Sequence, residues 1–138
     1  MSISAYLDNV AKPFMNLSSW LLRLSLGTSF ILHGLGKFPM PADGMVKLFE
    51  SKGILFPELT ASLVALGEVG AGAAVIIGGF IGATGHLVTR LGGGAVTVIM
   101  IGALVIAHPD WLITQKLFMS EQIFLLALGT YFAIRGNN

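Results

Sequence analysis

The ionisable side chains inside long apolar segments are the residues of this chain most able to do chemistry. Glu68 lies near the middle of such a segment, too far from either end for its short side chain to reach water. A charged group inside a membrane costs several kcal/mol unless it is paired or hydrated. The sequence therefore predicts that Glu68 is either protonated or paired with a cation, and the candidate partners are Arg23, His33 and Lys37.

His33 and His108 lie near the C-terminal ends of the first and third apolar segments, and so we expect them near the same membrane face. Two histidines without a ligand-spacing motif are weak support for haem or metal binding, so we expect neither. No hydrolase, phosphate-binding or dinucleotide motif occurs, and no catalytic residue is assigned. The predicted intramembrane polar cluster comprises Arg23, His33, Lys37, Glu68 and His108, with Arg90 and Glu121 as outlying candidates.

Small residues near these charges favour close approach of another helix. Gly27 and Gly34 fall on the same helical stripe as Arg23 and Lys37, which leaves room for a neighbouring helix or a ligand. In the second apolar segment small residues recur every four positions, a spacing typical of closely packed membrane helices. These residues are Gly70, Ala74, Gly78 and Gly82.

Composition indicates that lipid is the solvent for most of the surface. Of 138 residues, 54% are hydrophobic and 11% are charged, against about 25% charged residues in soluble domains. The length fits one domain, residues 1–138. A net charge of +1 without a basic run argues against nucleic-acid binding. The absence of cysteine excludes disulfides, thiolate nucleophiles and iron–sulfur ligation by this chain.

The apolar pattern predicts an all-α fold, a polytopic bundle of four transmembrane helices. Pro39 and Pro41 end the first helix, and a short amphipathic stretch after Asp43 is expected to form an interfacial helix in the first extramembrane loop. A Gly- and Thr-rich turn is expected over residues 82–89. The fourth span is short and needs tilt or a thin bilayer. The predicted spans are residues 17–38, 59–80, 91–108 and 117–135.

Membrane orientation is weakly marked. Lys and Arg are equally frequent on the two sides of the predicted bundle, whereas acidic residues crowd the side that carries the loops at residues 39–58 and 109–121. Basic residues normally mark the cytoplasmic side, but here they are evenly divided. The acidic residues, which contribute little to orientation, are the only remaining difference between the two sides. On that difference we expect the termini in the cytoplasm.

The residues above also form an ordered pattern. Residues 23–37 carry RxxxGxxFxxHGxxK, Glu68 lies in GEVGAG, and residues 89–108 read TRLGGGAVTVIMIGALVIAH. Together with SEQIFLLALG at the start of the fourth segment, this order resembles the DoxX family of small bacterial membrane proteins. The resemblance implies a four-helix protein of the bacterial inner membrane. By analogy with the DoxD subunit of thiosulfate:quinone oxidoreductase, it also implies a redox-linked role.

Three functions remain open. The first is a subunit of a membrane redox complex, with a groove between the first two helices that takes a quinone or a lipid tail. The second is a structural or assembly subunit without chemistry of its own, whose buried charges hold helices in register. The third is a small proton-coupled transporter with Glu68 as coupling carboxylate. The expected partners are the lipid bilayer and membrane protein subunits or a second copy of the chain.

Overall fold

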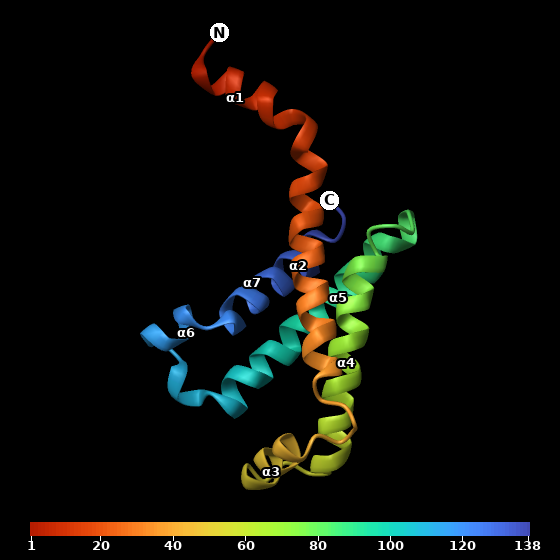
Figure 1. Ribbon diagram of the computed structural model, residues 1–138, viewed down its shortest axis with the longest axis vertical. Helices are drawn as coiled ribbons and strands as arrows, with labels where there is room; N and C mark the ends of the chain where they lie inside the picture. The colour runs from red at the N-terminus through yellow and green to blue at the C-terminus, as the bar shows by residue number, and fades with distance from the viewer.

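The computed structural model describes all 138 residues and contains only helices and their connections. Four long helices, α2, α4, α5 and α7, form the body of the molecule (Figure 1). The elements in chain order are α1 (Ile3–Ala11), the 3-10 turn η1 (Lys12–Phe14), α2 (Met15–Leu35), α3 (Asp43–Ser51), α4 (Pro57–Ile77), α5 (Ala83–Gly102), the π-helical segment η2 (Ala103–Ala107), the 3-10 turn η3 (Pro109–Trp111), α6 (Gln115–Met119) and α7 (Glu121–Arg135).

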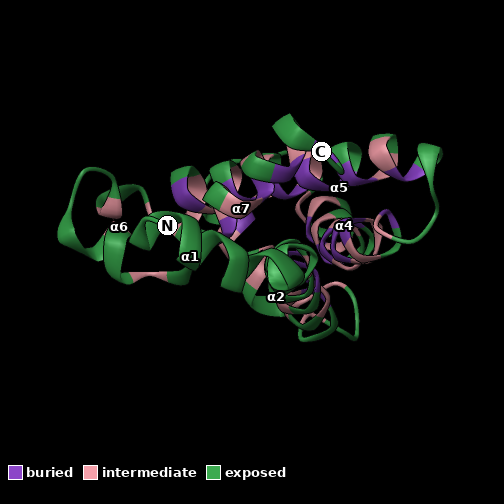
Figure 2. Cartoon of the chain, turned by 90° about the horizontal axis from the view of Figure 1, so that it is seen from above, coloured by how far each residue is buried: buried purple, intermediate pink, exposed green.

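The long helices pack as two pairs that cross each other. Helices α2 and α4 lie side by side, α5 and α7 form the second pair, and α4 also packs on α5 (Figure 1). The pairs meet near the C-terminus and diverge toward α3 and α6, while α1 projects away from them (Figure 1). Figure 2 shows buried residues along the facing sides of α4, α5 and α7 and an exposed α1. The shared core is built on Leu26, Phe30, Val75, Val96 and Phe132.

Glycines bring the helices of each pair into backbone contact. A Cβ on Gly27 would lie 2.8 Å from the carbonyl oxygen of Gly72, and one on Gly34 would lie 2.8 Å from that of Ala65. In the second pair a Cβ on Gly93 would lie 2.6 Å from the backbone nitrogen of Ala133. Such approaches leave no room for a side chain. Gly27 and Gly34 are therefore packing positions, as expected.

The predicted small-residue face of the second segment needs correction. Gly78 packs against Thr89 and Ala74 reaches toward Gly92, but Gly70 and Gly82 face open space. A spacing of four residues advances about 400° around a helix, so a face repeated three times drifts by about 120°. Gly82 lies outside α4 altogether, and its positive φ of 68° makes it the turn residue before α5.

Two helix boundaries also differ from those predicted. Helix α5 begins at Ala83 rather than near residue 91, so the turn after α4 covers only residues 78–82. Thr89, which we expected in that turn, is buried inside the helix. In the fourth segment Ser120 has an extended backbone (ψ 154°) that separates α6 from α7, so residues 117–120 do not lengthen the span.

The all-helical class is confirmed, and two helices are long and apolar enough to cross a membrane: α4, and α5 continued through η2, residues 83–107. The helices at the first and second predicted spans cover Met15–Leu35 and Pro57–Ile77. Helix α7 has 15 residues, about 22 Å at 1.5 Å per residue. The short helix expected after Asp43 is present as α3, with Phe49 buried.

Candidate functional site

The Glu68 carboxylate is paired, which is one of the two states that its position in an apolar segment allowed. Glu68 lies in the middle of α4 and is only 4% exposed. Its Oε2 accepts a hydrogen bond of 2.7 Å from Nζ of Lys37, which follows the end of α2. Nζ also donates to the carbonyl oxygen of His33 at 3.3 Å. Of the three candidate partners, Lys37 is therefore the cation that neutralises Glu68.

A contact between a histidine and a carboxylate lies near the Lys37–Glu68 pair but is open to solvent. Nε2 of His33 lies 3.0 Å from Oε1 of Glu121, and the two side chains are 38% and 59% exposed. The contact joins the last turn of α2 to the first residue of α7. Because exposed pairs gain little Coulomb energy, this contact holds the helices weakly.

A cavity of about 420 Å³ opens beside the Lys37–Glu68 pair, where the two helix pairs diverge. Most of the residues lining it are hydrophobic, and Met45, Leu48 and Phe49 of α3 form one wall. Its polar residues include His33 and His108 as well as the ion pair. The imidazole of His108 stacks on Trp111 with ring centroids 3.7 Å apart. The two histidines thus share a cavity, as their positions suggested, although each has its own partner.

The location of this cavity corrects the groove that we expected between the first two helices. The glycine stripe of α2 is filled by α4, because Gly27 and Gly34 contact the backbone of that helix. The open space lies instead between α4, α5 and α7, under α3. Gly27 and Gly34 bring α2 and α4 into contact, so no groove remains between these two helices.

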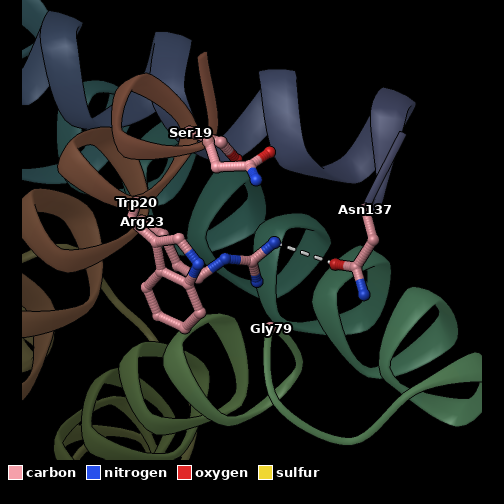
Figure 3. A pocket seen from close by; sticks show the side chains of 6 residues that line it. Ser19, Trp20, Arg23, Gly79 and Asn137 are labelled. Atoms are coloured by element: carbon pink, nitrogen blue, oxygen red, sulfur yellow. Dashed lines mark hydrogen bonds between the residues drawn. The ribbon is translucent and has the colours of Figure 1, made fainter. Parts of the chain in front are cut away.

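Arg23 does not join the other predicted polar residues. It is 3% exposed and lies where the helix pairs converge. Its Nη1 donates to the carbonyl oxygen of Val75 and to Oγ1 of Thr89 (2.8 Å), and its Nη2 donates to Oδ1 of Asn137 (2.8 Å; Figure 3). Lys37 lies 14 positions after Arg23, which corresponds to about 21 Å at 1.5 Å per residue. The five predicted residues are therefore divided between two sites, which corrects the single cluster.

The chain returns to Arg23 at its C-terminal end through a glycine cap. Gly136 has a φ of 59° and donates its N–H to the carbonyl oxygen of Phe132 at 2.8 Å, ending α7. Asn137 then lies over the α4–α5 turn, where its Nδ2 donates to the carbonyl oxygen of Gly78 at 2.9 Å. Asn137 was not among the predicted site residues, because nothing in the sequence indicates that a polar residue after the last helix contacts a buried side chain. Thr89, inside an apolar helix, could have been suspected.

The outlying candidates lie at the surface. Arg90 is exposed, and its Nη2 donates to the carbonyl oxygen of Ile134 at 2.6 Å, which fastens α5 to α7. Glu121 belongs to the exposed pair with His33. Arg90 thus ties helices together near the Arg23 site without contributing to it.

Comparison with known proteins places the chain in a family. The sequence model of the DoxX family matches residues 19–109, a range that starts in α2 and ends just after η2. It therefore includes Arg23, Lys37, Glu68 and His108 and stops before α6. No curated protein and no solved structure matches the chain. The family match covers well over half of the chain, which belongs to the DoxX family of membrane proteins.

Proposed function

We propose that the chain crosses a bacterial inner membrane four times, through α2, α4, α5 and α7, with its termini in the cytoplasm. Beyond the two long apolar helices, the outer faces of α2 and α7 support this arrangement because they carry exposed large hydrophobic residues, which lipid solvates better than water. On α2 and α7 these include Leu21, Leu24, Leu32, Leu35, Phe124 and Ile134. Helix α3 lies along the opposite interface. The 15 residues of α7 require local thinning of the bilayer.

The natural lack of cysteine gives a direct test of this topology. Single cysteines replace Ser2, Lys52 and Asn138, and intact cells are treated with a membrane-impermeant maleimide. We expect labelling of Lys52→Cys alone, with Ser2→Cys and Asn138→Cys labelled only after lysis. Labelling of one terminus and protection of the other would contradict an even number of crossings.

For the cavity we propose that it binds the head of a membrane quinone and that the chain is a quinone-binding subunit of a redox complex. The observation that carries this proposal is an apolar space of about 420 Å³ with an ammonium group and imidazoles in its wall. Small-molecule sites are typically about 300–1,000 Å³, mostly apolar, with a few polar groups that orient the ligand. Lys37 and His33 supply N–H donors for a quinone carbonyl, and Glu68 holds Lys37 in place.

The chain's part in the chemistry is binding and hydrogen bonding. Reduction of a quinone to a quinol takes two electrons and two protons. A redox centre on a partner subunit supplies the electrons, and water supplies the protons through groups at the cavity. An N–H donor on a carbonyl oxygen stabilises the negative charge that develops there on reduction. Protonation of the oxygen then completes the step.

The two tryptophans allow binding to be measured at the cavity itself. Trp111 stacks on His108, which lines the cavity. Trp20 instead lies near the start of α2, away from the cavity. In lipid nanodiscs, a short-chain ubiquinone should quench the fluorescence of Trp20→Phe protein, which keeps Trp111, in a saturable way. The matched Trp111→Phe protein, which keeps Trp20, should show only linear quenching. Equal quenching of both proteins would overturn the proposal.

A structural role is the second candidate, and the Lys37–Glu68 bond favours it. The bond joins the end of α2 to α4 over 31 residues of sequence and is partly buried, as a contact that sets helix register would be. The two functions differ in what Lys37→Met with Glu68→Leu should do. If the pair is purely structural, its replacement by apolar residues changes at most the stability, whereas a quinone site also loses saturable quenching of Trp111.

A further inference from the structure

Arg23 is a buried cation without a counter-ion. The structure has one ion pair, Lys37–Glu68, and one histidine–carboxylate contact, His33–Glu121, and neither involves Arg23. All three hydrogen-bond acceptors of Arg23 are neutral oxygens, one a carbonyl, one a hydroxyl and one an amide. Aromatic rings flank the guanidinium, with Trp20 at 5.4 Å and Phe132 at 5.1 Å. An unpaired charge in such surroundings is costly, and a bound anion would offset that cost.

A polar pocket of about 230 Å³ adjoins this guanidinium (Figure 3). Trp20 is the one hydrophobic residue among those that line it, and no acidic residue lines it. The residues are Asn16, Ser19, Trp20, Arg23, Gly79 and Asn137. Asn16, Ser19 and Asn137 bring amide and hydroxyl groups, which can donate hydrogen bonds to an anion. The pocket therefore offers one full positive charge, neutral donors and no negative charge.

The guanidinium has donors left for a ligand. A guanidinium carries five N–H groups, and three hydrogen bonds from Nη1 and Nη2 are formed within the chain. Nε has no hydrogen-bond partner in the chain, and a Cβ on Gly79 would lie 2.9 Å from it. The glycine thus keeps open the edge of the guanidinium that carries Nε. Two N–H groups on one guanidinium match the spacing of two oxygens of a phosphate.

We propose that this pocket binds a phosphate group, either the phosphate of an anionic lipid headgroup or free phosphate. The pocket lies at the end of the molecule where the C-terminal residues and the α4–α5 turn meet, opposite α3 (Figure 1). In the proposed topology this is the cytoplasmic interface, where anionic phosphates are abundant. A tetrahedral phosphate accepts hydrogen bonds from the guanidinium on one side and from Ser19 and Asn16 on the other. The bound phosphate supplies the charge that Arg23 lacks.

Ser19→Asp provides the sharpest test because it supplies an internal counter-ion without removing Arg23. Ser19 forms no side-chain hydrogen bond in the chain and lines the pocket, and an acidic residue at i pairs well with Arg at i+4 on a helix. The matched control is Ser18→Asp, which adds the same charge one residue away on α2 and outside the pocket. Arg23→Gln is the less informative variant, since it also breaks three hydrogen bonds.

The measurement is the melting temperature of purified, delipidated protein in a neutral detergent, titrated at constant ionic strength with sodium phosphate and, separately, with phosphatidylglycerol. Phosphatidylcholine and sodium chloride are the controls. We expect a saturable rise for wild type and for Ser18→Asp. For Ser19→Asp we expect a higher starting melting temperature and an affinity weaker by about tenfold or more, since a charge-assisted hydrogen bond is worth about 1.5–3 kcal/mol.

The two ligand arms separate the sources of the phosphate. A rise with both ligands supports a free-phosphate or headgroup site, and a rise with phosphatidylglycerol alone identifies a lipid headgroup. No rise with either ligand in wild-type protein would overturn the proposal. So would equal responses of Ser19→Asp and Ser18→Asp, because the anion would then be bound somewhere other than at Arg23.

Discussion

Each end of α2 holds a cation against the neighbouring helices, and the two ends do so in opposite ways. At one end Lys37 meets the carboxylate of Glu68, so the charge is neutralised within the chain. At the other end Arg23 meets only neutral oxygens. The difference follows from the antiparallel course of α4, which sets its one internal acid beside Lys37 and a backbone carbonyl beside Arg23. The charge of Lys37 is therefore balanced within the chain, whereas that of Arg23 is balanced only by the phosphate that we propose to bind there.

Breaking the paired end should give the largest loss of stability. Glu68→Leu leaves Lys37 without its counter-ion, and removal of one partner of a buried pair costs about 3–5 kcal/mol. We expect a loss near the lower value, because the Lys37 side chain is 22% exposed and can reach water. The free energy of unfolding, measured by titration with sodium dodecyl sulfate in mixed micelles, checks the expectation.

The double variant Lys37→Met with Glu68→Leu is the control for that loss. Replacing both charges by apolar residues removes the desolvation penalty along with the attraction. Its stability should return to within about 1 kcal/mol of wild type, since the coupling between contacting residues is then removed as a unit. If the double variant is as unstable as Glu68→Leu, packing around α4 rather than charge is responsible for the effect.

At the unpaired end a smaller loss is expected from Thr89→Val, a change of nearly equal shape. It removes the hydroxyl that accepts from Arg23 at 2.8 Å and itself donates to Asn137 at 2.7 Å. A hydrogen bond to a charged group is worth about 1.5–3 kcal/mol. The same micelle titration should show a loss in this range for Thr89→Val. Thr97→Val on the same helix should cost less, because the Thr97 hydroxyl contacts only neutral groups.

The close approach of α2 and α4 brings Arg23 and Lys37 to their partners on α4. Two glycines of α4 test this approach as a matched pair. A Cβ on Gly72 would lie 2.5 Å from the carbonyl oxygen of Gly27, while one on Gly70 would meet nothing within 4 Å. Gly72→Ala should therefore lower the free energy of unfolding by about 1–3 kcal/mol, as overpacking does. Gly70→Ala should leave it unchanged or raise it by up to about 1 kcal/mol through helix propensity. Equal effects would mean that the helices can separate to accept a methyl group.

That Glu68 must be neutralised could be predicted from the sequence because the constraint there is local. An acid in the middle of an apolar segment must be protonated or paired with a cation whatever the rest of the fold does, and few cations were within reach of Glu68. The α3 helix was likewise predictable from its amphipathic pattern. The cavity was misplaced, because the pattern cannot tell whether Gly27 and Gly34 leave space for a ligand or for a helix backbone.

The unpaired end could not be predicted, because it depends on contacts between residues far apart in sequence. Arg23 and Asn137 are separated by 114 residues, and Asn137 reaches the pocket only because Gly136 turns the chain back after α7. The start of α5 was missed for a related reason. Polar residues such as His86 and Thr89 read as a turn, whereas in the fold His86 accepts from the Asn137 N–H and Thr89 from Arg23.

The smallest change in the free energy of unfolding is expected at the exposed His33–Glu121 contact. Comparing this contact with Lys37–Glu68 shows how much of the effect comes from burial. Glu121→Gln and Glu68→Gln make the same chemical change to two acids. Each acid contacts a basic side chain at or just beyond the end of α2, His33 for Glu121 and Lys37 for Glu68. The Glu121 side chain is 59% exposed and that of Glu68 is 5% exposed. Because exposed pairs contribute only about 0–1 kcal/mol, Glu121→Gln should change the free energy of unfolding by less than 1 kcal/mol. A loss for Glu121→Gln as large as for Glu68→Gln would mean that α7 is held to α2 mainly by this contact, and that the divergence of the helix pairs is set by charge rather than by glycine packing.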